Sequence, residues 1–140
     1  MLWTAFALAA GSVPSLRPEL APFEFLVGHC WSATVADKAV DTHCFTAMFG
    51  GQHVRDVHIV RGPGGEYRGE TIYSWDPGRN TVRYSYYNSL GSVLEGTMVA
   101  SAGGLNFTPG VGGPVVWRKH ADDGYDVVAG GRILRFRRLS

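Results

Sequence analysis

Short runs in which apolar and polar residues alternate fill most of this chain and constrain its fold more than any other feature. Turn-forming residues separate the runs, among them the pairs Gly50-Gly51, Gly64-Gly65 and Gly130-Gly131. A period of two residues is typical of β-strands, and connections this short make neighbouring strands antiparallel. An unbroken series of hairpins predicts an all-β fold, a single up-and-down antiparallel β-barrel of about ten strands. The expected strands are residues 30–36, 40–48, 52–61, 67–75, 81–88, 92–100, 105–109, 115–120, 125–129 and 132–139.

Length and composition fit one folded domain, which we expect to span residues 15–140. The chain has 140 residues, of which 45% are hydrophobic and 12% aromatic, and this is enough for a packed core. A net charge of +1 provides no field that would attract nucleic acid. No apolar run approaches the about 20 residues of a transmembrane helix. The sequence indicates no oligomeric state.

Residues 1–14 form an apolar, alanine-rich arm, in which Ala7-Leu8-Ala9 resembles a signal-peptidase site. The arm lacks a basic n-region, and its apolar stretch is short for a signal peptide. Two interpretations stay open: a partial signal segment whose true start lies upstream of Met1, or a flexible N-terminal arm. We expect a periplasmic or secreted protein, and a cytoplasmic protein is the alternative.

The segment 15–27 is expected to cap one end of the barrel. Leu16, Leu20, Phe23 and Val27 have helical spacing, but interspersed prolines limit a helix to one short turn or two.

This cap leads into Gly28-His29-Cys30-Trp31, which resembles the glycine-x-tryptophan start of the calycin barrels: the lipocalins, the fatty-acid-binding proteins and the nitrobindin-like domains. The expected strand number is more similar to the fatty-acid-binding and nitrobindin branches than to the lipocalins. The segments 54–58, 67–76 and 84–89 resemble uncharacterised bacterial calycin-like proteins. The resemblance implies a barrel fold and carries no activity.

Two His-Cys pairs, His29-Cys30 and His43-Cys44, together contain the side chains of a zinc site. Adjacent residues of a strand point to opposite faces, so these four side chains do not converge, and we expect no metal site. A turn near Asp37-Lys38 places residues 30 and 44 almost opposite one another. Cys30 and Cys44 are therefore a candidate disulfide in an oxidising compartment, and buried thiols otherwise.

One face of the middle strands is expected to point into the barrel. A turn centred near Gly78 places residue 70 opposite 86, and a turn centred near Gly64 places residue 58 opposite 70. The opposite face carries more charge, so we expect it to face water. The expected inner face reads Asp56, His58, Glu70, Ile72, Ser74, Val82, Tyr84, Tyr86, Leu94 and Met98.

An apolar and aromatic lining with a few polar groups is typical of a ligand pocket. The leading hypothesis is binding of a small apolar or amphipathic molecule, with no cofactor. The predicted ligand-binding residues are Asp56, His58, Glu70, Ile72, Tyr84 and Tyr86. One alternative is a barrel enzyme of isomerase or hydrolase type that uses His58 or Glu70 as a general base. Another is a scaffold filled by its own side chains. The resemblance to the nitrobindin-like domains would imply a haem with an axial histidine, for which His120 is the only late-strand candidate; the alternative is that His120 is an ordinary exposed histidine.

Overall fold

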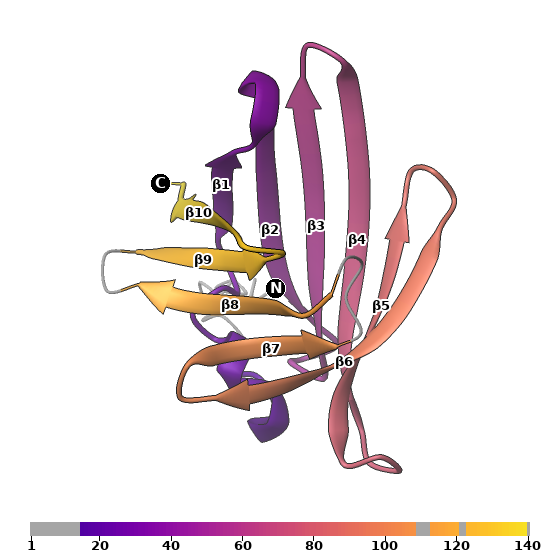
Figure 1. Ribbon diagram of the computed structural model, residues 1–140. Helices are drawn as coiled ribbons and strands as arrows, with labels where there is room; N and C mark the ends of the chain where they lie inside the picture. The colour runs from indigo at the N-terminus through magenta and orange to yellow at the C-terminus, as the bar shows by residue number, and fades with distance from the viewer. Residues whose placement is uncertain (1–14, 109–112, 121–122, 140) are drawn as a thin grey trace, which may run out of the picture.

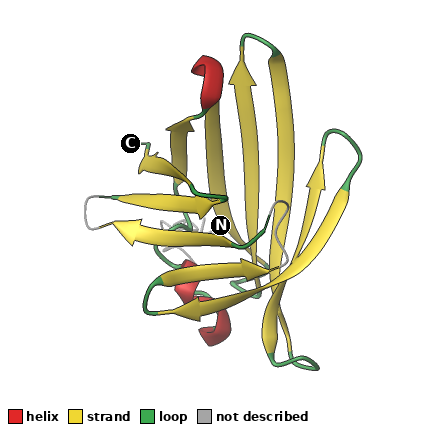
Figure 2. Ribbon diagram, viewed as in Figure 1, coloured by secondary structure: helices red, strands yellow, loops and turns green. Residues whose placement is uncertain are grey.

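Ten β-strands form one closed barrel in the computed structural model, which describes residues 15–108, 113–120 and 123–139 (Figure 1). Two short 3-10 helices, η1 (Pro18–Phe23) and η2 (Ala36–Lys38), are the helical segments of these residues (Figure 2). Neither is long or apolar enough to cross a membrane. The strands are β1 (Cys30–Thr34), β2 (Val40–Met48), β3 (His53–Gly62), β4 (Gly65–Asp76), β5 (Thr81–Asn88), β6 (Val93–Ser101), β7 (Gly104–Thr108), β8 (Val115–His120), β9 (Gly124–Ala129) and β10 (Arg132–Arg138).

Each strand pairs with the next one along the chain, and β1 pairs with β10 to close the barrel. All ten strand pairs are antiparallel, so the predicted up-and-down topology is confirmed. In Figure 1, β2, β3 and β4 run up one side, while β7, β8 and β9 run across that direction. Successive turns alternate between the two ends, because each strand reverses the direction of the last. The turns after β1, β3 and β5 therefore lie at the end opposite η1.

The segment before β1 caps the other end, as predicted. Leu20 and Phe23 of η1 are completely buried, and the ring of Phe23 lies 4.6 Å from that of Tyr73 inside the barrel. Gly28 has a φ of 85°, a left-handed conformation that glycine adopts without strain. This bend lets Trp31 turn into the core, where its indole N–H donates a hydrogen bond to the carbonyl of Leu26. The arm of residues 1–14 lies outside the described residues.

Cys30 and Cys44 are paired across β1 and β2, and a disulfide joins them with their Cα atoms 4.1 Å apart. The expected hairpin therefore forms, with η2 at its turn. Alternation along β2 places the disulfide on the outer wall and His43 on the inner wall.

The register of β4 differs by one residue from the prediction. Gly62 pairs with Gly65 and Asp76 pairs with Thr81, so each flanking turn is centred between two residues. The prediction centred each turn on a glycine. A slip of one residue moves every side chain of a strand to the other face. The predicted faces of β3 and β5 hold, whereas the predicted face of β4 is wrong.

Removing the disulfide should destabilise the barrel without unfolding it. The bond closes a loop with a sequence separation of 14 residues, and loss of such a cross-link costs about 3 kcal/mol through the entropy of the unfolded chain. We expect the double variant Cys30→Ala/Cys44→Ala to show this loss in urea unfolding. A reducing agent should lower the stability of the wild type and leave the double variant unchanged; equal stability of all samples would contradict the prediction.

Candidate functional site

The interior of the barrel contains a cavity of about 440 Å³. Its walls differ in chemistry. β6, β7 and β8 contribute apolar side chains, Leu94, Phe107, Val115 and Trp117, whereas β2 to β5 contribute most of the polar ones. The polar side of the lining consists of His43, Asp56, His58, Thr71, Tyr73, Tyr84 and Tyr86. Leu94, which is 37% exposed, follows the β5–β6 turn at the end opposite η1, so that end offers the access to the cavity.

A second hollow, of about 620 Å³, is lined by charged groups, among them Arg79, Arg83 and Glu95. Buried polar groups converge in the interior cavity and not in this hollow, so the interior cavity is the candidate site.

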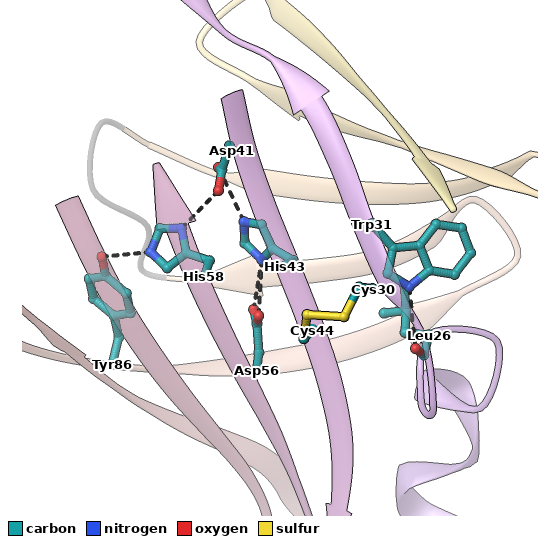
Figure 3. Close-up of polar contacts among 9 residues, drawn as sticks. All are labelled: Leu26, Cys30, Trp31, Asp41, His43, Cys44, Asp56, His58 and Tyr86. Atoms are coloured by element: carbon teal, nitrogen blue, oxygen red, sulfur yellow. Dashed lines mark hydrogen bonds and ion pairs between the residues drawn. A yellow bond between two sulfur atoms is a disulfide. The ribbon is translucent and has the colours of Figure 1, made fainter. Parts of the chain in front are cut away.

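His43 is held between two carboxylates on the polar wall (Figure 3). Its Nδ1 lies 3.0 Å from both carboxylate oxygens of Asp56 on β3. Its Nε2 lies 3.2 Å from Oδ2 of Asp41, which is on β2 like His43 itself. Carboxylates only accept hydrogen bonds, so an imidazole with a carboxylate at each nitrogen has to donate from both. His43 is therefore an imidazolium, with only 12% of its side chain exposed.

The charges of this cluster support one another. Burial by itself would lower the pKa of His43, but the carboxylates of Asp56 and Asp41 outweigh burial and raise it to about 10. Burial by itself would raise the pKa of Asp41, but hydrogen bonds from His43 and His58 hold that pKa well below its usual range. The two carboxylates and one imidazolium together carry one excess negative charge.

His58 extends the cluster towards the open end. Its Nδ1 lies 3.2 Å from Oδ1 of Asp41, and its Nε2 lies 3.1 Å from the hydroxyl of Tyr86. A carboxylate only accepts, so Nδ1 donates to Asp41, while Nε2 and the hydroxyl of Tyr86 share the second hydrogen bond. The hydroxyl of Tyr67 in turn hydrogen-bonds that of Tyr86. Burial and this second hydroxyl raise the pKa of Tyr86 above its usual range.

A glycine makes the contact between His58 and Tyr86 possible. Gly69 of β4 lies between β3 and β5 on the inner face, opposite His58. A Cβ atom there would lie 2.2 Å from Nε2 of His58 and 2.6 Å from Cε2 of Tyr86, far inside van der Waals contact. The missing side chain at Gly69 thus lets two side chains meet across an intervening strand.

The structure places four of the six predicted ligand-binding residues on the inner wall: Asp56, His58, Tyr84 and Tyr86. Glu70 and Ile72 lie on the outer wall, which corrects the prediction for β4. Glu70 forms a bidentate ion pair with Arg55, with one N–O distance of 2.5 Å and the other of 3.1 Å, and the hydrogen bond from Arg55 lowers the pKa of Glu70. His58 and Glu70, the two alternative general bases of the enzyme hypothesis, therefore lie on opposite faces of the barrel wall.

Asp41 was not among the residues predicted from the sequence, and His43 was considered there only as part of a His-Cys pair. A signal for both was present, because Asp41, His43 and Phe45 alternate along one strand on the face opposite Cys44. Thr71 and Tyr73 were assigned to the wrong face because of the slip in β4. Nothing in the sequence singled out Gly69.

Two other histidines lie away from the cluster. His29 precedes β1, and both cysteines of the His-Cys pairs are joined in the disulfide. His120, the late-strand candidate for a haem ligand, has its Nε2 2.7 Å from a carboxylate oxygen of Asp126.

The fold and the cavity define a class, a ten-stranded antiparallel up-and-down barrel with an internal pocket, which is consistent with a calycin-like fold. The comparisons with known proteins add no family to this class. No family model matches the chain, and no curated protein matches it.

The buried imidazolium should make the stability of the barrel depend on pH. A pKa raised from 6.5 to about 10 on folding stabilises the protein fully below pH 6.5, and this stabilisation is lost as the pH rises towards about 10. We expect the free energy of unfolding to fall over this range in urea titrations. The fall should be smaller in His43→Asn, which should itself lose about 3 kcal/mol at neutral pH because two carboxylates lose their counter-ion.

Ring ¹⁵N NMR of the wild type provides a second measurement that does not require the variant to fold. The two ring nitrogens of His43 should stay protonated above neutral pH. A ring that loses its proton near the ordinary histidine pKa would contradict the assignment.

Replacing Gly69 should break the contact between His58 and Tyr86. We expect Gly69→Ala to cost about 1–3 kcal/mol of stability, because the added methyl group has to displace one of the two rings. Gly64→Ala is the matched control, since a Cβ there meets no atom within 4 Å. Tyr86→Phe should cost less stability in the Gly69→Ala background than in the wild type. Additive effects would contradict this coupling.

Proposed function

We propose that the barrel binds a small, largely apolar molecule in its cavity, with a polar group of that molecule facing the polar wall. The observation that carries the proposal is the cavity of about 440 Å³ with aromatic side chains on one side and the buried polar cluster on the other. Ligand pockets commonly measure about 300–1,000 Å³ and combine an apolar lining with a few placed polar groups. The volume is also an argument against a scaffold filled by its own side chains.

The arrangement favours a particular kind of ligand. Phe107 and Trp117 lie with ring centroids 4.6 Å apart and offer a broad aromatic surface. On the opposite wall, the cluster of Asp41, His43 and Asp56 has an excess negative charge. A neutral apolar molecule with a hydrogen-bond donor, or a cationic group, complements this wall better than an anion does.

The proposal extends to family and location. The cap, Gly28 and the buried Trp31 support membership of the calycin barrels. The disulfide of Cys30 and Cys44 supports a periplasmic or secreted location, because disulfides persist mainly in oxidising compartments.

A cavity-filling variant tests the binding. Thr71 lines the cavity and is 7% exposed, so Thr71→Phe should fill part of the pocket. With N-phenyl-naphthylamine, an uncharged fluorophore with one N–H donor, we expect saturable one-to-one binding to the wild type. The affinity of Thr71→Phe should fall at least about tenfold, which corresponds to about 1.4 kcal/mol.

Thr46→Phe is the matched control, because the same substitution lies on the exposed outer face of β2. It should bind the fluorophore like the wild type. Equal binding by all three proteins would place the fluorophore outside the cavity and overturn the proposal, and so would the absence of saturable binding to the wild type.

A further inference from the structure

Three metal-ligating side chains meet on the polar wall. Asp41, His43 and His58 each direct one ligand atom towards the others, and these atoms all lie within 4.8 Å of one another. One ion that holds its ligands at about 2.0–2.2 Å in a tetrahedral site keeps the ligand atoms about 3.3–3.6 Å apart. The three ligand atoms therefore have to close in by about 1 Å at most to share an ion.

Each histidine already has a partner at its other ring nitrogen. Nδ1 of His43 contacts Asp56, which leaves Nε2 directed towards Asp41. Nε2 of His58 contacts the hydroxyl of Tyr86, which leaves Nδ1 directed towards Asp41. Protein metal sites use the same arrangement, in which an outer acceptor takes the second N–H and fixes the orientation of the ring (Figure 3).

The proton inventory is consistent with an ion at this position. Binding needs the lone pairs of Nε2 of His43 and Nδ1 of His58. The proton of His43 leaves to solvent. With the ion at Nδ1, His58 keeps its proton on Nε2 and donates it to the hydroxyl of Tyr86. With both rings neutral, the carboxylates of Asp41 and Asp56 contribute two negative charges, which a divalent cation neutralises.

We propose that Asp41, His43 and His58 form a binding site for a divalent first-row transition metal ion on the wall of the cavity. Two imidazoles and one carboxylate suit Zn²⁺ or Fe²⁺ and not the oxygen-binding Ca²⁺ and Mg²⁺. His43 and His58 line the cavity, so the remaining coordination positions of the ion face the space where a small molecule would lie. The inference goes beyond the proposed function and does not depend on it.

Zn²⁺ alone is the probe in the first experiment. The full chain, treated with a chelator and then titrated calorimetrically, should bind one equivalent of Zn²⁺, with Mg²⁺ giving no heat of binding. His58→Gln should weaken Zn²⁺ binding more than about a hundredfold, and Asp56→Asn, which changes the outer partner of His43, about 10–100-fold. His53→Gln is the matched control on the same strand, because His53 bonds Ser74 on the opposite face. Wild-type affinity in His58→Gln, an equal loss in His53→Gln, or no stoichiometric binding by the wild type would overturn the site.

Cobalt spectroscopy keeps the test valid if a variant is unstable. Co²⁺ added to the wild type should give the visible absorption of a low-coordinate site with nitrogen ligands, and Zn²⁺ should displace it. A spectrum identical to that of aqueous Co²⁺ would overturn the proposal.

Binding of N-phenyl-naphthylamine to the chelator-treated protein separates the two proposals. Fluorophore binding without Zn²⁺ binding would leave the cavity function standing and remove the metal site, whereas the reverse result would keep the metal site and remove the apolar ligand.

Discussion

A charged imidazole between two carboxylates, inside a barrel, is the interaction on which the rest of this structure depends. Charges out of contact with water are tolerated only when they are paired and hydrogen-bonded. His43 meets that condition only if Asp41 and Asp56 both lie on its face of the sheet. A slip of one residue between β2 and β3 would bring Thr42 or Cys44 inward and leave Asp56 unpaired in the core. The ion pairs therefore select the register of these two strands more strictly than their apolar residues alone would.

Two glycines explain how aromatic side chains can border a cavity instead of filling it. Gly69 lies beneath the meeting point of His58 and Tyr86, and a Cβ at Gly96 of β6 would lie 2.5 Å from the hydroxyl oxygen of Tyr84. At both positions a ring from a neighbouring strand occupies the space that a Cβ atom would take. Rings held in this way stay close to the wall, and the space along the barrel axis remains open.

The strands and their order could be predicted from the sequence because each depends on local information, the alternation of residue types and the chemistry of the turns. The pairing of Cys30 with Cys44 could be predicted for the same reason, since it needs only one hairpin. The inward-pointing face of β4 could not be predicted, because it depends on whether a turn is centred on a residue or between two residues. Turn composition does not distinguish these cases. An error of half a residue in the centre of the turn placed Glu70, instead of Thr71, on the inner face of the barrel. The meeting of Asp41, His43 and His58 depends on the register between β2 and β3 and on which face of each strand points inward. It could therefore be recognised only in the folded barrel.

The outer and inner faces of β2 are linked by the same alternation that defines the strand. The disulfide fixes Cys44 to β1 on the outside, and His43, the next residue, thereby takes its position on the inside. Asp41 follows two residues away on that inner face. A covalent bond on the wall thus restrains the strand that carries two of the three side chains of the cluster, while β3, which contributes Asp56 and His58, is held to that strand by backbone pairing and by the side-chain hydrogen bonds of the cluster itself. His58 joins this strand to β5, because its ring contacts Asp41 at one nitrogen and the hydroxyl of Tyr86 at the other.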